Sequence, residues 1–443
     1  MCDKIMSLNN SIKNKSAKIG IIGLGYVGLP LARIFCNKSF SVIGFDIDNK
    51  KIESLKNKKT YIKHIDDNVI SEMIDNGNFS PTTDFSLISN VDIIIICVPT
   101  PLSIYREPDL GPVLSTGKTI SPYIKKDQLI ILESSTYPGT TSEQLTKVIE
   151  RSGLEANTDF HIAYSPERED PGNKDFGTDT IPKVVGADSP EALQLSTLLY
   201  EQVISSVTPV SNTKTAEAVK LTENIFRSVN IALSNELKVI FDEMDIDVWE
   251  VIDAAASKPF GFMPFYPGPG VGGHCIPIDP FYLTYKAREF GVATRFIELA
   301  GEINNSMPSY VVEKATKALN DHSKKALNGS KVLMIGIAYK KDVDDMRESP
   351  SLILLELLEN NGAIVDYHDS YVPTIPVTRD HESLSGRKST SLDPVKIKSY
   401  DLIIIGTNHS TCDYQLLLDH GSIILDTRNA MKGLSGKAVI MKA

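Results

Sequence analysis

The stretch Lys18-Ile19-Gly20-Ile21-Ile22-Gly23-Leu24-Gly25-Tyr26-Val27-Gly28 decides the fold of the first part of the chain. It starts with an apolar run of strand length and ends with a GxGxxG pattern, directly before a predicted helix over Val27–Cys36. In such a turn, the first glycine permits a tight bend, the second lets the backbone approach a pyrophosphate, and the third allows close helix–strand packing. The free N–H groups of the helix N-terminus then face the phosphates. The stretch therefore predicts a dinucleotide site whose contacts are Gly23, Gly25, Tyr26, Val27 and Gly28; a glycine turn without a ligand is the alternative.

A carboxylate follows at the distance that this motif requires. Asp46 ends the second predicted strand, Ser41–Asp46, 18 residues after Gly28. A carboxylate at this place accepts hydrogen bonds from the ribose hydroxyls and repels a 2′-phosphate, which favours NAD over NADP. Lys51 is a candidate contact near the adenosine, and a solvated helix lysine is the alternative.

The pattern around this motif indicates an α/β protein. Short apolar runs alternate with helix-like stretches: Lys18–Ile22, Val91–Val98, Gln128–Glu133 and His161–Tyr164 are predicted strands. This alternation is typical of a doubly wound parallel sheet with helices on both faces. From Thr213 to Asp245 the chain has no Gly or Pro and shows helical spacing, so we predict one long helix there.

After Asn328-Gly329-Ser330 the strand–helix alternation restarts. We therefore predict two Rossmann-like domains joined by a helical middle domain. The expected bounds are a flexible tail over 1–16, an NAD-binding domain over 17–212, a helical, dimerising middle domain over 213–327 and a second Rossmann-like domain over 328–443.

Composition excludes several classes of function. The formal net charge of −10 over 443 residues leaves no basic excess for nucleic acid. The five cysteines are scattered without a CxxC pair, which suits a reducing cytoplasm and predicts no metal site. The first residues carry no apolar signal sequence, and the apolar runs are far shorter than the roughly 20 residues of a membrane span. We expect a cytoplasmic protein without membrane insertion.

The loop Gly270-Val271-Gly272-Gly273-His274-Cys275-Ile276-Pro277-Ile278-Asp279-Pro280 carries the most chemical information. Its glycines permit close approach of the backbone to a ligand, and its prolines stiffen it. A cysteine in such a loop is a candidate nucleophile, whereas Cys36 and Cys97 lie on apolar elements and are expected to pack. Asp279 is a candidate to orient the groups around the thiol, and His274 is a less favoured candidate to lower the thiol pKa.

Other polar residues lie where catalytic groups are expected. On the long helix, the spacing of Glu217, Lys220 and Asn224 puts them on one face, where Lys220 and Asn224 could donate to an oxyanion. Judged on this helix alone, a solvated face is the favoured alternative. Thr136 follows one predicted strand and could bind a hydroxyl or water, and Glu167 follows the next and is a candidate general base.

Cations lie at the strand ends of the second Rossmann-like domain. Lys340 and Arg347 follow its first strand and Arg428 follows its last, where a ligand of an open α/β sheet binds. Three cations there suit a diphosphate, and surface ion pairs are an equal alternative. The glycine pattern Gly336-Ile337-Ala338 is incomplete, so we expect a ligand other than NAD, or packing alone.

Together and in this order, these motifs resemble the UDP-glucose/GDP-mannose dehydrogenase family from about Ala17 to the C-terminus. The resemblance implies an NAD-dependent four-electron oxidation of a sugar CH2OH to a carboxylate through a cysteine thiohemiacetal and a thioester. It implies that Cys275 is the nucleophile, that Lys220 and Asn224 stabilise oxyanions, and that Glu167 is the acid/base. By the same resemblance Thr136 positions water or the alcohol, Asp279 supports the cysteine, and further contacts are Thr100 and Arg347 to the cofactor and Lys340 and Arg428 to UDP.

Several departures from the UDP-glucose enzymes point to another branch. Pro171 stands where a second Glu is usual in Pro166-Glu167-Arg168-Glu169-Asp170-Pro171-Gly172, and Ile278 stands where a Lys is usual. Lys258-Pro259-Phe260-Gly261-Phe262 and Pro267-Gly268-Pro269-Gly270 resemble bacterial UDP-N-acetylglucosamine 6-dehydrogenases, which feed surface-polysaccharide (O-antigen or capsule) synthesis. We expect a UDP-N-acetylhexosamine substrate. Its expected contacts are Glu167, Arg168, Lys220, Asn224, Lys258, Gly272, Gly273, Lys340 and Arg428.

Other functions remain open at this point. The same chemistry on UDP-N-acetylgalactosamine, UDP-N-acetylmannosamine or UDP-glucose is the near alternative. A two-electron hydroxyacid-type dehydrogenase would need neither Cys275 nor the last domain, and an inactive nucleotide-sugar sensor is a remote reading. By the family resemblance, the helical middle domain predicts a homodimer or higher homo-oligomer.

Overall fold

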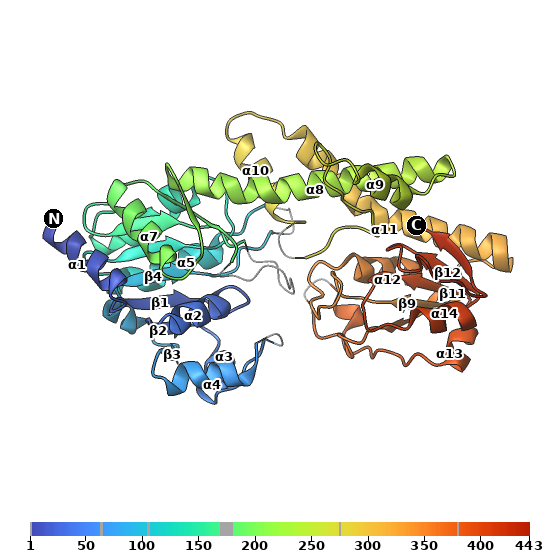
Figure 1. Ribbon diagram of the computed structural model, residues 1–443, viewed down its shortest axis with the longest axis horizontal. Helices are drawn as coiled ribbons and strands as arrows, with labels where there is room; N and C mark the ends of the chain where they lie inside the picture. The colour runs from blue at the N-terminus through green and yellow to red at the C-terminus, as the bar shows by residue number, and fades with distance from the viewer. Residues whose placement is uncertain (1, 63–64, 104–106, 169–179, 274–275, 379–380) are drawn as a thin grey trace. The chain divides into compact units, whose positions relative to one another are not determined.

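The structure of the protein is a computed structural model that describes residues 2–62, 65–103, 107–168, 180–273, 276–378 and 381–443. They form two compact units, which Figure 1 shows coloured along the chain. The first unit consists of Met1–Glu223 with Phe281–Val292, and the second of Asn224–Pro280 with Ala293–Ala443. The boundary falls inside one continuous helix, α8 (Thr213–Glu243), which was predicted over almost the same residues. The division into three domains at 212 and 327 stays a prediction.

The described residues of the first unit form an eight-stranded sheet in the order β3-β2-β1-β4-β5-β6-β7-β8. The six strands from β3 to β6 are parallel, and β1 lies between β2 and β4 as in a dinucleotide-binding fold. The predicted doubly wound parallel sheet is confirmed. The strands are β1 (Lys18–Ile22), β2 (Ser41–Phe45), β3 (Phe79–Thr82), β4 (Ile93–Ile96), β5 (Leu129–Leu132), β6 (His161–Tyr164), β7 (Lys183–Ala187) and β8 (Val207–Val210).

One strand of this sheet reverses direction. β7 pairs with β6 antiparallel, with Ala163 opposite Ala187 and Tyr164 opposite Gly186, and β8 continues parallel to β7. The start of β7 therefore lies at the edge where β5 and β6 end. Neither β7 nor β8 was predicted from the sequence.

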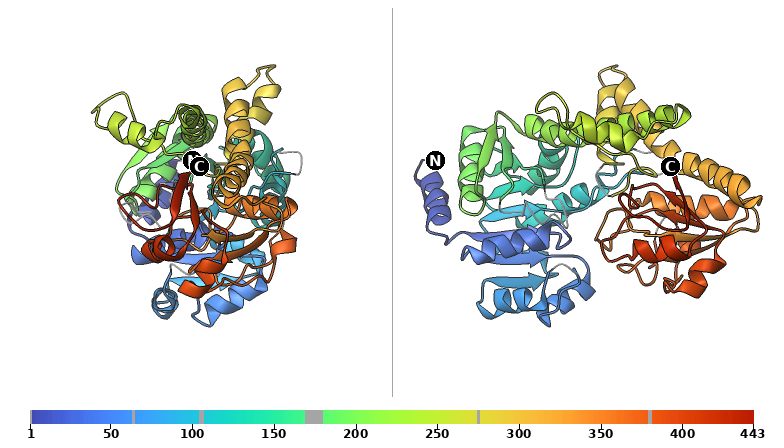
Figure 2. Two further views of the ribbon diagram at one scale, coloured as in Figure 1. Left: turned by 90° about the vertical axis from the view of Figure 1, so that its right-hand side faces the viewer. Right: turned by 45° about the vertical axis from the view of Figure 1, so that its right-hand side comes forward.

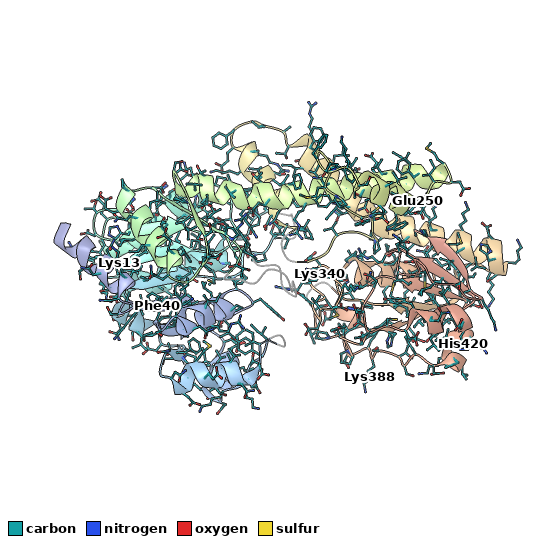
Figure 3. The ribbon with its side chains drawn as sticks, viewed as in Figure 1. Lys13, Phe40, Glu250, Lys340, Lys388 and His420 are labelled. Carbon is teal, nitrogen blue, oxygen red and sulfur yellow. The ribbon has the colours of Figure 1, made fainter. Side chains whose placement is uncertain are left out.

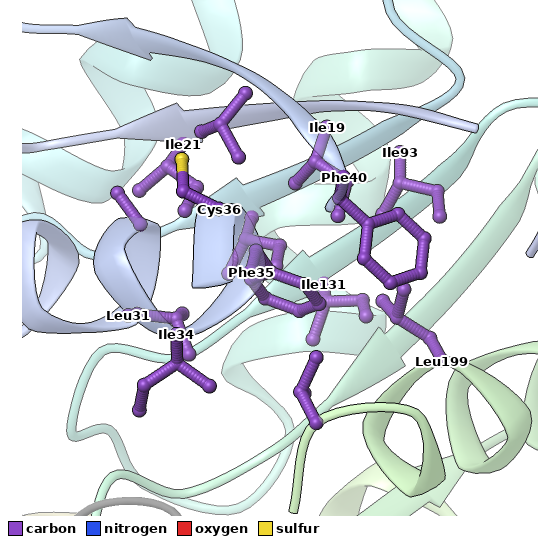
Figure 4. Packing of buried hydrophobic residues seen from close by; sticks show 14 of the residues in the cluster. Ile19, Ile21, Leu31, Ile34, Phe35, Cys36, Phe40, Ile93, Ile131 and Leu199 are labelled. Atoms are coloured by element: carbon purple, nitrogen blue, oxygen red, sulfur yellow. The ribbon is translucent and has the colours of Figure 1, made fainter. Parts of the chain in front are cut away.

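The strand residues of the first unit alternate between two apolar cores. Ile19, Ile21 and Ile131 face a core formed with α2 and α7, and Ile22 and Ile130 face a core formed with α5 and α6. Figure 2 shows helices on both sides of the sheet, and Figure 4 shows residues of α2 packed on the first core. Cys36 is part of that core and 5% exposed, which confirms the packing role predicted for it.

The N-terminal residues differ from the flexible tail that the sequence predicted. Cys2–Lys13 form helix α1, which lies against α7. Leu8 and Ile12 are buried in the first core, and Ile12 is inaccessible to solvent. Their spacing of four residues puts both side chains on one face of the helix, and burying that face holds the segment in place. Reading the segment by its Lys, Asn and Ser content overlooked this short apolar stripe.

The remaining helices of the first unit cover the sheet or connect its strands. The α-helices are α2 (Gly28–Asn37), α3 (Asn49–Lys56), α4 (Asp67–Asp75), α5 (Gly111–Ile120), α6 (Thr146–Ile149) and α7 (Pro190–Glu201). Shorter 3-10 and π segments are η1 (Phe85–Asn90), η2 (Ser121–Tyr123), η3 (Thr140–Leu145) and η4 (Glu150–Ser152). Helix α10 (Asp279–Arg288) starts in the second unit and ends in the first.

The described residues of the second unit contain a five-stranded parallel sheet in the order β10-β9-β11-β12-β13. Its cores again lie on both faces: Val332 and Met334 face α11 and α12, and Leu333 and Ile335 face α13 and α14. The strands are β9 (Lys331–Ile335), β10 (Ile364–His368), β11 (Leu402–Ile405), β12 (Ile423–Asp426) and β13 (Val439–Lys442). The helices are α9 (Val248–Ala255), α11 (Arg295–Ser323), α12 (Pro350–Asn360), η5 (Glu382–Leu384), α13 (Pro394–Ser399) and α14 (Tyr414–His420).

No helix in the described part of the chain has the length and apolar character needed to cross a lipid bilayer.

Candidate active site

The glycine turn after β1 has the geometry that a pyrophosphate requires. Gly23 has a φ of +92°, and a Cβ atom there would lie 2.6 Å from the Cys97 carbonyl oxygen. A Cβ atom on Gly28 would overlap the Gly23 carbonyl group, so this glycine lets α2 approach the turn. At Gly25 a Cβ atom would meet no protein atom within 4 Å. The outer two glycines thus serve packing, and the middle one leaves space for a ligand.

Asp46 lies beside this turn and fastens it. Its carboxylate accepts hydrogen bonds from the N–H groups of Leu24 at 2.9 Å and Asp48 at 3.0 Å. Lys51 lies next to it, with Nζ 3.2 Å from Asp46 Oδ2. The Asp46 side chain is 6% exposed and directly follows the end of β2. Tyr26, in the turn, is 39% exposed.

Thr100 lies beyond the end of β4 and is covered by a residue that sequence reasoning did not identify. It is 4% exposed, and its carbonyl oxygen accepts a hydrogen bond from Tyr282 Oη at 2.6 Å. Tyr282, on α10, is inaccessible to solvent. Tyr282 belongs to Phe281–Val292, the segment by which the chain re-enters the first unit after the second. Its bond to Thr100 joins this segment to the sheet edge where the glycine turn lies.

Thr136 is buried after β5 and faces a carboxylate from α8. Its hydroxyl donates to Glu217 Oε1 at 3.4 Å, and Glu217 also accepts from the N–H groups of Gly139 at 2.6 Å and Thr141 at 2.8 Å. Burial raises the pKa of Glu217 to about 7, although these hydrogen bonds act in the opposite direction. Glu217 therefore fixes the segment after Thr136 to the long helix.

Glu167 and Lys220, predicted as separate parts of a site, are in contact. Lys220 Nζ donates to the Glu167 carbonyl oxygen at 2.5 Å, and Lys220 is 8% exposed. This burial excludes the solvated-face interpretation of Lys220. The Glu167 carboxylate lies 3.4 Å from Lys183 Nζ.

Arg168, predicted to contact substrate, makes its described contacts within the protein. Its guanidinium forms two hydrogen bonds to the Glu223 carboxylate, at 2.6 and 3.3 Å, and one to the Pro182 carbonyl oxygen at 2.6 Å. These bonds fix the backbone next to Glu167. Direct contact with substrate by Arg168 stays a prediction.

Asn224 and Asp279, both in the second unit, are also in contact. Asn224 Nδ2 donates to Asp279 Oδ2 at 2.5 Å, and the two residues are 4% and 2% exposed. Asp279 is the first residue of α10, where a carboxylate interacts favourably with the helix dipole. Lys220 and Asn224 lie one turn apart on α8, as their spacing predicted.

The glycines before the cysteine pack closely against other residues of the second unit. A Cβ atom on Gly272 would lie 2.7 Å from the Glu348 carbonyl oxygen, and one on Gly273 would lie 2.8 Å from the Tyr339 ring. Gly273 N–H also donates to the Arg347 carbonyl oxygen at 3.1 Å. These contacts explain why glycines precede the cysteine. The predicted nucleophile Cys275 and its neighbour His274 lie outside the described residues.

The predicted cations of the second unit lie in different surroundings. Arg428 Nε donates to the Gly406 carbonyl oxygen at 2.9 Å, and burial lowers the pKa of Arg428 to about 10. Arg347 forms an ion pair with Asp345 at 2.6 Å and is 46% exposed. Lys340, which is labelled in Figure 3, follows the turn after β9 and is half-buried. Lys258 is exposed, with Nζ 5.1 Å from the centre of the Phe260 ring.

Sequence reasoning missed several polar residues that hold the predicted ones. Lys183, Glu133 and Tyr200 form a buried cluster behind Glu167. Glu217 was predicted to share a helix face with Lys220 and Asn224, but its bond to the segment after Thr136 was not predicted. The available signals were a lysine in front of the apolar run Val184-Val185-Gly186-Ala187 and a glutamate at the end of Leu129-Ile130-Ile131-Leu132. A charge next to a buried strand needs a partner, and each of these residues is the other's partner.

The turn after β1 fits NAD. The open space at Gly25, the start of α2 at Gly28 and the carboxylate of Asp46 provide a place for the pyrophosphate and an acceptor for a ribose hydroxyl. Within the described ranges, we find no group of three or more His, Cys, Asp or Glu side chains that could hold a metal ion.

Comparison with known proteins agrees with this geometry. Residues 17–204 match the NAD binding domain of the UDP-glucose/GDP-mannose dehydrogenase family, residues 214–306 its central domain and residues 333–433 its UDP binding domain. NAD is thus the cofactor of the chain, and the expected resemblance is confirmed over all three domains.

Individual relatives are similar along almost their whole lengths. The chain is 37% identical to a UDP-N-acetyl-D-glucosamine 6-dehydrogenase of Salmonella typhi over 88% of this chain and 90% of that protein. It is 36% identical to the enzyme of the same name from Pseudomonas aeruginosa, over 89% and 91%. The solved structure of a UDP-D-ManNAc dehydrogenase from Pyrococcus horikoshii superposes with a TM-score of 0.86 at 30% identity, over 96% and 98% of the two chains. The chain belongs to the UDP-glucose/GDP-mannose dehydrogenase family and is an NAD-dependent nucleotide-sugar oxidoreductase.

Proposed function

We propose that the protein oxidises the C6 hydroxymethyl group of UDP-N-acetylglucosamine to the carboxylate. The overall reaction consumes one UDP-sugar, two NAD⁺ and one water, and it gives one UDP-uronate, two NADH and three protons. NAD, when bound, accepts a hydride in each of the two oxidations. The product is a uronic-acid donor of the kind used to build surface polysaccharides such as O-antigen or capsule.

In this proposal Cys275 holds the carbon between the two oxidations. Its thiolate forms a C–S bond to the aldehyde carbon, and the aldehyde oxygen takes up a proton to give a thiohemiacetal. Loss of a hydride and a proton from this adduct gives a thioester. Water then forms a C–O bond to the same carbon, the C–S bond breaks, and the thiolate leaves. A covalent adduct of this kind keeps the aldehyde on the enzyme.

Lys220 and Asn224 serve as the hydrogen-bond donors to the oxyanions of this sequence. The hydrogen bond from Lys220 Nζ to the Glu167 carbonyl oxygen, at 2.5 Å, is the observation that carries the proposal. It joins the candidate oxyanion donor to the candidate acid/base, and an ammonium group has further N–H donors for a second acceptor. The bond between Asn224 and Asp279, at 2.5 Å, supports a fixed amide donor one turn further along α8.

The remaining roles follow the same assignment. Glu167 takes and returns protons, Thr136 positions water or the sugar alcohol, and Asp279 supports the cysteine loop through Asn224. Cofactor contacts are assigned to the glycine turn with Tyr26 and Val27, and to Asp46, Lys51, Thr100 and Arg347. Substrate contacts are assigned to Arg168, Lys258, Gly272, Gly273, Lys340 and Arg428.

The choice of sugar rests on sequence similarity. Two relatives aligned over about nine tenths of their lengths are named UDP-N-acetyl-D-glucosamine 6-dehydrogenases. Other relatives are named UDP-N-acetyl-D-mannosamine dehydrogenases, including one from Campylobacter jejuni at 34% identity. An N-acetylated UDP-hexosamine is therefore the proposed substrate class, and the glucosamine epimer is the proposed member.

A substrate panel with NADH counting tests both parts of the proposal. The purified chain is given NAD and, in turn, the UDP-linked N-acetylated glucosamine, galactosamine and mannosamine and UDP-glucose. We expect the highest kcat/KM with UDP-N-acetylglucosamine and two NADH per sugar consumed. A higher kcat/KM with another sugar replaces the epimer and leaves the chemistry. One NADH with a released aldehyde indicates a two-electron dehydrogenase, and no turnover with any sugar indicates a nucleotide-sugar sensor.

Two variants separate the covalent step from oxyanion stabilisation. Cys275→Ser should lose turnover and still bind UDP-sugar, and full activity would reject the covalent role. Lys220→Ala should lower kcat by about a hundredfold or more, as removal of an oxyanion donor does. Lys214→Ala, on the same helix with 53% of its side chain exposed, is the matched control and should keep the native rate. Equal rates for the two lysine variants would reject the oxyanion role of Lys220.

A homodimer or higher homo-oligomer is also part of the proposal. Helix α8 exposes the apolar side chains of Phe226, Leu233 and Ile240, and Met244 follows its last residue; each is at least 46% exposed in the single chain. Apolar surface of this kind favours association. Light scattering after size-exclusion chromatography should give at least twice the mass of one chain, and Leu233→Lys with Ile240→Lys should reduce it to that of one chain.

A further inference from the structure

We propose that Lys183 is a positioning residue for the Glu167 carboxylate and that buried Glu133 and Tyr200 hold Lys183 in that place. The inference rests on the acid/base role proposed for Glu167 and adds to it the cluster that sets its orientation and charge.

The reversal of the sheet at β7 brings Lys183 to this position. Lys183 is the first residue of β7, and β7 runs antiparallel to β6 with Tyr164 opposite Gly186. Continuing this register by three residues sets Glu167 opposite Lys183. The hydrogen bond from Ser165 Oγ to the Val184 carbonyl oxygen, at 2.8 Å, agrees with that alignment. In a parallel strand the first residue would lie at the opposite edge of the sheet, away from Glu167.

Lys183 lies between two carboxylates. Its Nζ is 2.8 Å from Glu133 Oε2 and 3.4 Å from Glu167 Oε2. The other oxygen of Glu133 accepts a hydrogen bond from Tyr200 Oη. The Glu133 side chain is inaccessible to solvent and that of Lys183 is 6% exposed, whereas Glu167 keeps 14% exposure. The cluster thus runs from the core at Tyr200 to the accessible carboxylate at Glu167.

The charges of the cluster make Lys183 a permanent cation. Burial alone would lower the pKa of Lys183, but Glu133 and Glu167 raise it above the usual value. Burial raises the pKa of the Glu133 carboxyl, and Lys183 opposes this shift. Lys183 therefore lies between two carboxyl groups, and Glu167 is the solvent-facing end of the cluster.

Other groups near the cluster come from several elements. Cys97 follows β4 and responds electrostatically to Glu133, Lys183 and Glu167, and burial raises the pKa of its thiol well above the usual value. Lys220 on α8 binds the Glu167 main chain, and Arg168 is paired with Glu223. Among the described residues, the titratable and charged groups near Glu167 therefore include Glu133, Lys183, Tyr200, Cys97, Lys220, Arg168 and Glu223.

Two charge changes should move the titration of Glu167 in opposite directions. Glu133→Gln removes a negative neighbour and leaves Lys183 to Glu167, which lowers the pKa of Glu167. In the Glu133→Gln background, Lys183→Met then removes the positive neighbour and raises it. A charge within about 4–6 Å shifts a carboxyl pKa by about 1–3 units. A Lys183 side chain that does not act on the Glu167 carboxylate would give no such opposed shifts.

The choice of variants protects the fold. Lys183→Met alone would strand the buried Glu133 carboxylate, which is strongly destabilising, whereas replacing both members of a buried pair is often tolerated. The double variant Lys183→Met with Glu133→Gln is therefore the test, and Lys183→Arg is the conservative control that keeps the cation. Thermal unfolding of each variant verifies that it is folded before its kinetics are read.

The readout is the acidic limb of the pH profile of kcat/KM. This limb, where activity falls as the base becomes protonated, should move down by about one pH unit in Glu133→Gln. It should move up by at least as much on going from Glu133→Gln to the double variant, and Lys183→Arg should keep the native limb. Limbs that coincide in all folded variants would overturn the positioning role.

Glu167→Gln separates this result from a failure of the proposed function. If the acidic limb disappears in Glu167→Gln but does not move in the cluster variants, Glu167 is the base and the inference about Lys183 is wrong. If the limb persists in Glu167→Gln, the acid/base assignment itself fails, and the inference about Lys183 falls with it.

Discussion

The two sheets of the protein have a similar plan around their first strands, but the carboxylate beside that strand has different partners in each. In the first unit a glycine turn follows β1, and Asp46 follows the neighbouring β2; in the second a turn follows β9, and Asp369 follows the neighbouring β10. Both carboxylates bind the turn next to them. The difference between them distinguishes the carboxylate hydrogen bonds that hold the turn from the acceptor capacity that remains for a cofactor.

Asp369 is bound by several donors of its own unit. Its carboxylate accepts from the N–H groups of Ile337, Ala338, Tyr371 and Val372, and Oδ2 lies 3.1 Å from His409 Nε2. Burial would raise the pKa of Asp369, but His409 and these N–H groups hold it below its usual value. Four backbone donors and an imidazole leave this carboxylate no capacity for a ribose.

Asp46 accepts fewer hydrogen bonds from the protein than Asp369 does. It accepts from two backbone N–H groups and one lysine, and the adjacent Gly25 leaves space where a Cβ atom would meet no protein atom. In the second unit the turn residues Ile337 and Ala338 are inaccessible to solvent. The same sheet edge thus holds a dinucleotide in one unit, and the match of the other unit to a UDP binding domain fits its closed turn.

The largest expected effect is the loss of NAD affinity when the open space at Gly25 is filled. Gly25→Val fills the open space with two methyl groups and should weaken NAD binding by at least about a hundredfold, roughly 2.8 kcal/mol. UDP binding should not change, because Gly25 belongs to the glycine turn of the first unit, and the UDP binding domain belongs to the second. Calorimetric titration of both ligands checks this, and equal loss of both ligands would point to unfolding instead.

Arg428 provides the reciprocal change. Arg428→Gln removes a cation beside β12 and should weaken UDP binding by about tenfold to a hundredfold, as loss of a charged hydrogen bond does. NAD binding should stay native. Arg387→Gln is the matched control, since Arg387 pairs with Glu359 in the same unit. If both arginine variants bind UDP equally well, Arg428 has only a packing role.

Asp369→Asn should affect stability and not ligand choice. Oδ2 of Asp369 accepts from the N–H groups of Ile337 and Ala338 and faces His409. Because the substitution removes the negative charge from these hydrogen bonds, it should lower the free energy of unfolding by about 1–3 kcal/mol. Because the folded-state pKa is lowered, the charge contributes stability above the unfolded pKa of about 3.9 and loses it as pH falls through the folded pKa. Urea unfolding at pH 7 and pH 3 should give a large difference from the native chain at pH 7 and a smaller one at pH 3; a constant difference would reject the electrostatic cause.

Asp46→Asn should give the smallest effect, on cofactor choice. The amide keeps an acceptor for the turn but loses the charge that repels a 2′-phosphate, so the preference for NAD over NADP should fall by about tenfold. Asp48→Asn, which keeps the cap of α3, is the control and should retain the native preference. The ratio of kcat/KM for the two cofactors measures it; an unchanged ratio in Asp46→Asn would remove the role given to this carboxylate.

Local sequence patterns predicted the parts of the fold that depend on them. The strand–turn–helix from Lys18 to Cys36 and the long helix α8 follow from apolar periodicity and from the placement of glycine and proline. The antiparallel β7 did not, because strand direction depends on long-range pairing that a five-residue apolar run cannot encode. Helix α1 was missed because its buried stripe is only Leu8 and Ile12 within a polar segment.

The candidate site was predictable to the same extent. Spacing on one helix placed Lys220 and Asn224 on a common face, and strand ends identified Glu167 and Thr136. The partners Lys183, Glu133, Glu217 and Tyr282 come from elements distant in sequence, so only the folded chain brings them to these residues. Sequence therefore identified the candidate reactive groups, and the folded chain was needed to find the residues that contact them.

Calorimetric titration of the native chain tests most directly whether each sheet takes one kind of ligand. NAD should bind at one site per chain, and UDP should then bind at one further site without displacing it. A second NAD site, or competition between UDP and NAD for the same site, would contradict the division of roles between Asp46 and Asp369.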